Sequence, residues 1–329
     1  MSTTPRLSLV VATFNRPVSL ARLLRELAAQ TLPASDFEVV VVDDGSAVPV
    51  EPQLRSLAPA YAMRVVAQAN AGAAAARHRG VLEARGELIV IVDDDMELPA
   101  AFLAEHLAQH PPGSRRVVLG RMLAPPGRLP IFERYHAVML DRLAEDVRRG
   151  RVQPRGTHLF TGNVSFRRAD YFAAGGFDAS LKQSEDAELG IRLEKAGAEV
   201  QLCEAAYSIH HSDHTSVETW MRRAYQYGLW DHRIAQKHPD VPAADPWRFL
   251  SMVHPISRPI LIASVGLPRL MAGIAWLGIR CAQALDRLGA SRPAVAAATL
   301  VYGVQYYRGL RAAVGSLASV RHELALRRR

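Results

Sequence analysis

Four short apolar runs, separated by segments of helical periodicity, dominate the first 100 residues of the chain. They occupy residues 6–14, 37–46, 63–68 and 86–95. Between the first two runs, leucines recur from Leu20 at the i, i+3, i+4, i+7 spacing of an amphipathic helix. Short buried strands that alternate with helices are typical of βαβ units, so the sequence predicts an α/β fold with a mostly parallel sheet.

Polar clusters follow three of these runs, at the carboxyl ends of the predicted strands. They are Thr13-Asn15-Arg16, Asp43-Asp44 and Asp93-Asp94-Asp95. Ligands of parallel sheets bind beyond this edge, so we expect the clusters to form one site. Adjacent carboxylates repel one another, and Asp93 and Asp95 would share a face as oxygen ligands of Mg²⁺ or Mn²⁺. The alternative is a solvated acidic turn before the next helix.

Two further segments carry charged residues that suit a phosphate ligand and a general base. Arg77 lies among small residues that would let a phosphate approach it, although a solvated arginine on an alanine-rich helix is the alternative. Glu185 and Asp186 begin a helical segment, and the positive helix end would help to keep Asp186 ionised. A helix cap with acidic first-turn residues is the alternative there.

The net charge of +8 predicts an anionic partner for the chain. Nucleic acid, an anionic membrane and a phosphorylated substrate all qualify, but no nucleic-acid-binding module accompanies the arginines of the last third, so we expect no nucleic-acid partner. Cys203 and Cys281 form neither a disulfide framework nor a cysteine-rich zinc site, which fits a reducing cytosol. The first apolar run is too short for a cleavable signal peptide.

Five separated segments resemble the family 2 glycosyltransferases, which have the GT-A fold. The segments are VVATFNRP, VVVVDDGS, NAGAAAARHRG continuing to ARGELIVIVDDDMELP, TGNVSFRR and GGFDASLKQSEDAELGIRLEKAG, within about residues 6 to 215. The resemblance implies inverting transfer of a sugar from a nucleotide-diphosphate donor, expected to be a UDP-sugar, with Mn²⁺ or Mg²⁺ as cofactor. It also implies a central, mostly parallel sheet flanked by helices, to which this chain adds an α-helical C-terminal extension.

The resemblance implies a set of donor-binding residues. They would be Thr13, Asn15, Arg16, Asp44, Arg77, Asp93 and Asp94. Asp44 would accept a hydrogen bond from the base, and Arg77 would lie near the nucleotide or diphosphate. Asp94, pointing away from the metal-binding pair, would act as support. Ala12 stands where many relatives have Pro or Thr, which affects only a minor contact with the nucleotide.

The metal ligands follow from the same resemblance. Asp93 and Asp95 would match the Asp-x-Asp element of the family. Some relatives complete the coordination with a histidine about two dozen residues after the catalytic base. That spacing indicates His210 first and His211 second, in a cluster that also contains His214.

The acceptor side has a base and three neighbours in this interpretation. Asp186 would deprotonate the acceptor hydroxyl, because a single displacement needs a base opposite the stabilised diphosphate leaving group. The residues placed near the acceptor are Asn163, Glu185 and Trp220. Trp220 lies on a predicted helix with Arg222 and Arg223, and a core position for its aromatic stripe is the alternative.

Beyond about residue 250 the chain is apolar with arginines at intervals. The apolar runs 259–268, 270–279 and 293–307 are shorter than the roughly 18 residues of a spanning helix. Arg258, Arg269 and Arg280 recur every eleven positions and would share one face of a helix that Pro268 kinks. This pattern favours helices that lie on an anionic membrane surface. Two tilted spans, or a hairpin packed on the catalytic domain or in a homo-oligomer, are the alternatives.

We therefore predict a GT-A catalytic domain over residues 1–245 and a membrane-associated or oligomerising helical region over 246–329. The nucleotide-binding half would cover about 1–100 and the acceptor half about 101–245. The predicted enzyme is cytoplasmic, peripheral to the inner face of the cell membrane, and acts on a lipid-linked or growing cell-surface glycan. Alternatives are a soluble enzyme acting on a small molecule or protein, a nucleotidyltransferase, and a basic membrane or nucleic-acid adaptor with a degenerate site.

Overall fold

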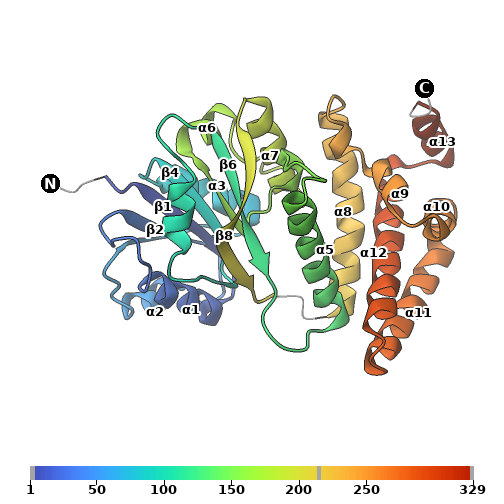
Figure 1. The fold of residues 1–329 in the computed structure, drawn as a ribbon, viewed down its shortest axis with the longest axis horizontal. Helices are drawn as coiled ribbons and strands as arrows, with labels where there is room; N and C mark the ends of the chain where they lie inside the picture. The colour runs from blue at the N-terminus through green and yellow to red at the C-terminus, as the bar shows by residue number, and fades with distance from the viewer. Residues whose placement is uncertain (1–3, 213–215, 327–329) are drawn as a thin grey trace. The chain divides into compact units, whose positions relative to one another are not determined.

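The computed structural model describes residues 4–212 and 216–326. Its first unit, Met1–Pro126 with Met139–Asp213, contains an eight-stranded sheet (Figure 1). The strands are β1 (Leu7–Thr13), β2 (Phe37–Asp43), β3 (Ala62–Ala67), β4 (Leu88–Asp93), β5 (Met96–Glu97), β6 (Arg116–Leu123), β7 (Asn163–Arg167) and β8 (Glu199–His210). Across the sheet they follow the order β3-β2-β1-β4-β7-β6-β8-β5.

Most strand pairs of this sheet are parallel. β1 pairs in parallel with β2 and β4, β2 with β3, and β6 with β8. β7 runs antiparallel to both β4 and β6, and β5 runs antiparallel to β8. The chain proceeds from β1 to one side of the sheet and later to the other, and ligands of such sheets bind in the crevice beyond this reversal. The predicted α/β fold with a mostly parallel sheet is confirmed.

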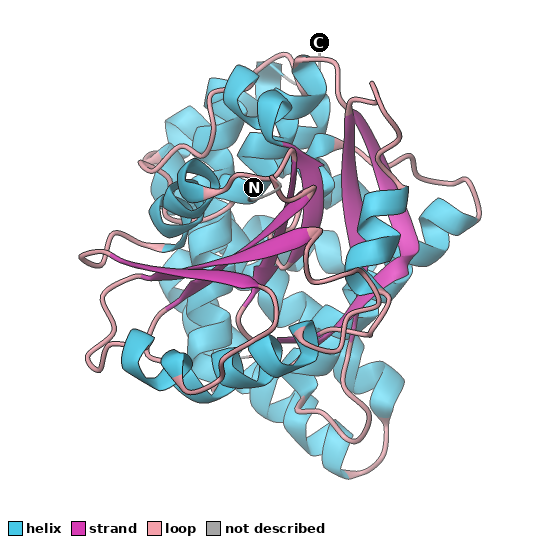
Figure 2. Ribbon diagram, turned by 90° about the vertical axis from the view of Figure 1, so that its left-hand side faces the viewer, coloured by secondary structure: helices cyan, strands magenta, loops and turns pink. Residues whose placement is uncertain are grey.

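Helices of the first unit lie on both faces of the twisted sheet (Figure 2). They are α1 (Pro17–Leu27), α2 (Glu51–Arg55), α3 (Ala73–Glu83), α4 (Phe102–Ala108), α6 (Arg168–Ala173) and α7 (Glu185–Lys195), with the 3-10 turn η1 (Gly156–His158). The leucines of α1 at the predicted helical spacing are all buried. The amphipathic pattern therefore fixes which side of α1 faces the sheet.

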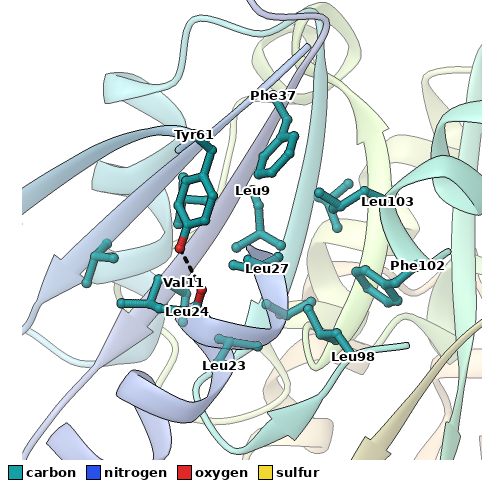
Figure 3. Packing of buried hydrophobic residues seen from close by; sticks show 14 of the residues in the cluster. Leu9, Val11, Leu23, Leu24, Leu27, Phe37, Tyr61, Leu98, Phe102 and Leu103 are labelled. Carbon is teal, nitrogen blue, oxygen red and sulfur yellow. Dashed lines mark hydrogen bonds between the residues drawn. The ribbon is translucent and has the colours of Figure 1, made fainter. Parts of the chain in front are cut away.

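Each face of the sheet has its own apolar core, because successive side chains of a strand point to opposite faces. Leu9 and Val11 of β1 belong to the core shown in Figure 3, with the buried leucines of α1. In the same core the Tyr61 hydroxyl donates a hydrogen bond of 2.8 Å to the carbonyl of Leu24. Val10, between the two β1 residues, joins the core that α3, α6 and α7 cover.

The strand register brings the three polar strand ends together. Ala12 of β1 pairs with Asp93 of β4, and Thr13 pairs with Asp43 of β2. The clusters that follow these strands therefore share one edge of the sheet, as the sequence predicts.

Helix α5 (Ile131–Arg148) is not among the helices that the sequence predicts. Its first turns carry Ile131 and Phe132, which are buried in the core of the second unit. Its last turns are held by ion pairs of Arg148 with Glu145 and Glu204. The helix is thus stabilised mainly by partners distant in sequence, which local periodicity does not reveal.

The second unit comprises Gly127–Val138 and His214–Arg329. Its further helices are α8 (Val217–Lys237), α9 (Phe249–Met252), α10 (Arg258–Gly266), α11 (Pro268–Arg287), α12 (Ser291–Val314) and α13 (Leu317–Leu326), with the 3-10 turns η2 (Pro242–Ala244), η3 (Pro246–Arg248) and η4 (Pro255–Ser257). This division differs from the predicted boundary at 245/246, because α8 groups with the C-terminal helices.

Two glycines explain why α8 packs closely on α12. A Cβ atom on Gly228 of α8 would lie 1.9 Å from the carbonyl oxygen of Tyr306, and a Cβ on Gly309 of α12 would lie 1.9 Å from that of Tyr225. Only glycine permits such a close backbone approach. The contact is reciprocal and ties α8 to the C-terminal helices.

An aromatic cluster forms part of the core of the second unit. Tyr135 and Tyr302 stack with ring centroids 4.8 Å apart, and Trp220 meets Tyr135 edge-on at 5.5 Å. Trp220 is fully buried. The predicted acceptor contact at Trp220 is therefore not supported, and the alternative of a core position is what the structure shows.

The C-terminal region is broken at Pro268 rather than kinked there. α10 ends at Gly266, and Pro268 is the first residue of α11, where its missing N–H costs no helical hydrogen bond. Arg258 therefore lies on α10, whereas Arg269 and Arg280 lie on α11, and the predicted single face with three arginines is wrong. No helix within the described residues is long and apolar enough to cross a membrane.

Candidate active site

Asp94 is held at the edge of the sheet by residues that follow β1. The Thr13 hydroxyl donates to its Oδ2 at 2.7 Å, and Arg16 donates from Nη1 to its Oδ1 at 3.0 Å. The same Arg16 nitrogen reaches Oδ2 of Asp95 at 3.2 Å. Burial raises the pKa of Asp94 to about 6, against the opposing effect of these two donors. In this structure Thr13 and Arg16 thus fix the acidic cluster, and Asp94 does not point away from Asp95, because both accept from the same Arg16 nitrogen.

Asn15 joins the loops that follow β1 and β2. Its backbone N–H donates to the Ser46 hydroxyl at 2.9 Å, and its side-chain oxygen accepts from the N–H of Ala47 at 2.8 Å. Its φ of 57° lies in the left-handed region, which asparagine tolerates better than most residues. Asn15 therefore shapes the rim of the site.

Asp44 is buried and anchors the loop that leads into α3. Its Oδ1 accepts from the Gln68 side chain at 2.8 Å and from the N–H of Ala71 at 2.9 Å, and its Oδ2 accepts from the N–H of Gly72 at 2.9 Å. An ionised carboxylate has about four acceptor positions, so one remains for a ligand. The structure gives Asp44 a loop-holding role, and its contact with a nucleotide base stays a prediction.

Arg77 connects two acidic elements of the site. From α3 it donates to Oδ1 of Asp93 at 2.6 Å and to Oε1 of Glu185 at 2.9 Å, and its side chain is 10% exposed. The two carboxylates raise its pKa further above its usual value despite burial. The sequence analysis placed Arg77 beside a phosphate, whereas in this structure its guanidinium bridges the end of β4 and the start of α7.

Asp186 follows Glu185 in the first turn of α7 and is half-buried. Burial raises the pKa of Asp186 to about 7; the neighbouring Glu185 adds to the rise and Arg77 opposes it. The sequence predicts that the positive end of α7 helps to keep Asp186 ionised, but the effect of burial on the pKa of Asp186 is larger. A carboxyl group that titrates near neutral pH can accept a proton from a substrate hydroxyl and release it again.

The turn before Asp186 has an unusual backbone. Ser184, the residue before α7, is buried and has a φ of 59° in the left-handed region. Such a conformation in a residue other than glycine costs on the order of 1 kcal/mol and is found most often near functional sites. It sets the direction in which α7 presents Glu185 and Asp186.

Asp95 and His210 lie close to one another at the edge of the sheet. Asp95 is buried, and its Oδ1 accepts no hydrogen bond within the part of the chain that the structure describes. That oxygen lies 3.6 Å from Nε2 of His210, a separation that one ion between the two atoms would bridge. His211 instead contacts Glu97 at 2.8 Å, and His214 lies outside the described residues.

The number of side chains at this position suits Mg²⁺ or Mn²⁺ only if other ligands come from elsewhere. Among the described residues no group of three His, Cys, Asp or Glu side chains is placed to hold a metal ion. Ions of this kind are commonly bound by one or two protein ligands and complete their shell with water and substrate phosphates. Asp95 with His210 matches that pattern, whereas Oδ1 of Asp93 is occupied by Arg77.

Asn163 belongs to a buried polar network and not to an exposed acceptor contact. His106 of α4 donates from Nε2 to its Oδ1 at 2.8 Å, and its own amide donates to the carbonyl of Ala206 at 2.9 Å. The Ser165 hydroxyl contacts His106 and His110 at 2.8 Å each. Burial lowers the pKa of His106 to about 4 and that of His110 to about 3, so both rings are neutral.

Sequence reasoning missed the two histidines of this network. His106 lies on α4 and His110 lies two residues beyond its end, whereas Asn163 and Ser165 share one face of β7 through their i, i+2 spacing. Polar residues at regular spacing within otherwise apolar segments were the signal in the sequence that could have indicated this network. The network links α4, β7 and β8 beneath the edge that carries Asp95 and His210.

The chain matches the family model described as Glycosyl transferase family 2 over residues 8–175. It is 30% identical over 268 residues to validoxylamine A glucosyltransferase of Streptomyces hygroscopicus subsp. jinggangensis (strain 5008), which covers 72% of this chain and 62% of the relative. Pre-mycofactocin glycosyltransferase of Mycobacterium tuberculosis (strain ATCC 25618 / H37Rv) is 27% identical over 239 residues, covering 72% and 49%. The chain thus spans about half to three fifths of the length of these curated relatives.

Solved structures have a similar fold. Mannosyltransferase PcManGT from Pyrobaculum calidifontis in complex with GDP-Man and Mn²⁺ gives a TM-score of 0.63 at 19% identity, over 93% of this chain and 87% of that chain. S. aureus TarS 1-349 in complex with UDP gives 0.50 at 18%, over 97% and 92%. These likenesses show the GT-A fold. With the family model matching about half of the chain, the protein is a member of glycosyl transferase family 2.

Proposed function

We propose that the protein transfers a sugar from a nucleoside-diphosphate donor, with UDP expected, to a hydroxyl acceptor by a single inverting displacement. The observation that carries the proposal is the arrangement at the sheet edge. Asp186, whose pKa is raised to about 7, directly follows Glu185 at the start of α7. Arg77 forms ion pairs with both Glu185 and Asp93. Asp93 ends β4, two residues before Asp95. A base and an acidic metal-binding element are thus connected through one guanidinium.

Asp186 is the proposed base. Inverting displacement requires proton removal from the acceptor hydroxyl on the side opposite the leaving group. Asp186 Oδ1 accepts the N–H of Ala187 at 2.8 Å, which orients the carboxyl group. Arg77 and the left-handed turn at Ser184 hold the start of α7 in place. Asp186 is thus oriented and has a pKa raised to about 7.

Asp95 and His210 are the proposed ligands of Mn²⁺ or Mg²⁺, with Asp93 nearby on the donor side. When bound, the ion would neutralise the negative charge that develops on the departing diphosphate. The complex of PcManGT with GDP-Man and Mn²⁺, a structure with the same fold, supports divalent metal use. The complex of TarS with UDP supports a nucleoside-diphosphate donor, and nucleotide-binding assays should compare UDP with GDP, because the PcManGT complex contains GDP-Man.

The acceptor is proposed to be a glycan or lipid-linked hydroxyl compound. The two curated relatives are named for validoxylamine A and pre-mycofactocin, which makes a small-molecule acceptor the alternative. A panel of acceptors tested with one donor would separate these classes.

The metal assignment is tested by thermal shift with UDP or GDP, with and without Mn²⁺. Binding at about 100 times the dissociation constant stabilises the folded state by about 2.7 kcal/mol. We expect His210→Ala to abolish the Mn²⁺-dependent part of this stabilisation. His211→Ala is the matched control, because His211 is the next residue but contacts Glu97. Equal loss in both variants, or unchanged metal dependence in His210→Ala, would contradict the assignment.

The base assignment is tested with Asp186→Asn, which keeps the shape of the side chain. We expect nucleotide binding to persist while transfer falls by about 10²–10⁴, the usual contribution of a general base. Full transfer activity in this variant would exclude Asp186 as the base. Loss of nucleotide binding as well would show that its role is in the donor site.

A further inference from the structure

Helix α11 exposes an apolar face that the core of the second unit does not use. Its large apolar members are Leu270 (59% exposed), Ile274 (45%), Leu277 (60%) and, just after the helix, Leu288 (82%). Their spacing of four, three and eleven positions places them along one line of the helix. We refer to these four residues as the α11 outer face.

The opposite side of α11 already supplies the core contacts. Met271, Ala275, Ile279 and Ala282 are buried in the core that includes α12. The α11 outer face is therefore not needed to complete the fold. Several large apolar side chains exposed together on one helix of a folded unit indicate an interaction surface.

Basic and aromatic side chains border this face. Arg269, Trp276 and Arg280 are all exposed, and the Arg280 guanidinium lies 4.9 Å from the centre of the Trp276 ring. Tryptophan and arginine beside an apolar stripe are typical of helices that lie at a membrane interface.

The charge of this part of the chain identifies the partner. Residues 246–322 contain nine arginines and a single acidic residue, Asp286. Asp286 is itself paired with Arg134 and Arg128. This segment alone carries as much net positive charge as the whole chain, whose net charge is +8.

We propose that the α11 outer face docks on an anionic phospholipid membrane. The leucines and Ile274 would enter the boundary between headgroups and acyl chains, while Arg269 and Arg280 would contact lipid phosphates. A symmetric contact with a second copy of the chain would instead bring like-charged arginines together, which is unfavourable. The proposal concerns the second unit and does not depend on the function proposed for the sheet edge.

Vesicle co-sedimentation tests the proposal with the full chain. We expect binding to phosphatidylcholine vesicles that contain phosphatidylglycerol, little binding to pure phosphatidylcholine, and weaker binding at high salt. Arg269→Gln with Arg280→Gln should weaken binding roughly 25-fold, at about fivefold for each arginine. The matched control is Arg55→Gln with Arg142→Gln, two exposed arginines elsewhere in the chain that make the same change in charge.

The apolar contribution has a second pair of variants. Leu270→Ser with Leu277→Ser should weaken vesicle binding by about tenfold or more, because two apolar insertions are lost. Val18→Ser with Leu82→Ser serves as the control, since both side chains are exposed apolar groups of the first unit. Circular dichroism melting curves for each variant verify that it is folded.

Trp276 provides a direct reading of which face inserts. It is 53% exposed, whereas Trp220, Trp230 and Trp247 are at most 8% exposed. Brominated lipids should therefore quench Trp276 on vesicle binding, and Trp276→Phe should remove the quenching. Absence of binding to anionic vesicles, or binding without quenching, would overturn the proposal. A dimer in light scattering that Leu270→Ser with Leu277→Ser converts to monomer, without vesicle binding, would assign the face to self-association and overturn it equally.

Discussion

Removal of Arg77 should destabilise the first unit by about 3 kcal/mol. Arg77→Met keeps most of the apolar stem but leaves Asp93 and Glu185 without their shared cation. Breaking a buried ion pair in this way costs about 3–5 kcal/mol. Asp93 is 33% exposed and can be solvated in part, so we expect the lower end of this range. For a unit of this size the loss corresponds to a decrease in Tm of roughly 6–12 °C.

The two units can be followed separately in one experiment. All four tryptophans follow residue 213, so tryptophan fluorescence reports only on the second unit, whereas far-UV circular dichroism reports on both. Arg77→Met should lower the transition of the first unit and leave the fluorescence transition unchanged. Arg79→Met is the matched control on the same helix, because Arg79 is 46% exposed and an exposed ion pair such as that with Glu83 contributes little to stability.

The sign of the pH dependence gives an independent check on the Arg77 prediction. The penalty arises from the negative charge of the two carboxylates, so it should grow as pH rises and shrink as acid neutralises carboxyl groups. Glu185→Gln added to Arg77→Met should recover part of the loss. A decrease in Tm no larger than that of Arg79→Met, or one that is independent of pH, would refute the reasoning.

Two further predictions concern pH and helix packing. With Asp186 as the proposed base, its ionised form is the active one, so kcat/KM should rise about tenfold per pH unit up to the pKa of Asp186, about 7, and then level. A pH–rate profile that is flat from pH 5 to 8 would contradict this proposal. The pKa of Asp186 is higher in the folded state than in the unfolded chain, so protonation of this group favours folding. This contribution to the free energy of unfolding is fully present below about pH 4 and is lost as pH rises through about 7. Gly228→Ala should lower the fluorescence transition of the second unit, because the new Cβ would meet the Tyr306 carbonyl at 1.9 Å. A Cβ atom on Gly273 would meet no atom within 4 Å, so Gly273→Ala should stabilise the second unit by about 0.5–1 kcal/mol. Equal effects of the two substitutions would refute the packing argument.

The sheet and the position of the site were predictable because both follow from local patterns. Buried strands such as β2 and β4 are continuous apolar runs, and each ends in carboxylates that must lie at the sheet edge. Family resemblance then separated this edge from an ordinary acidic turn. Asp95 and His210 lie close together because Met96, the residue after Asp95, pairs with His210 in the register of β5 and β8.

The partners of individual side chains were less predictable, because they depend on tertiary contacts. The partners of Arg77 lie 16 and 108 positions away, and nothing near Arg77 in sequence distinguishes a carboxylate partner from a phosphate. The aromatic stripe of α8 is equally compatible with a core and with a binding surface until α12 covers Trp220. Pro268 can kink a helix or begin one, and the choice depends on where α10 ends.

The aromatic cluster of the second unit can form only late in synthesis, because its members are far apart in the sequence. Tyr135 leaves the ribosome about 170 residues before its stacking partner Tyr302. At roughly 5–20 residues per second, the ring waits about 10 to 30 s for that partner. In that interval the rest of the first unit emerges and can fold, while the apolar segment that carries Ile131, Phe132 and Tyr135 stays exposed. A chain that stops before α12 would display this segment permanently to chaperones and proteases.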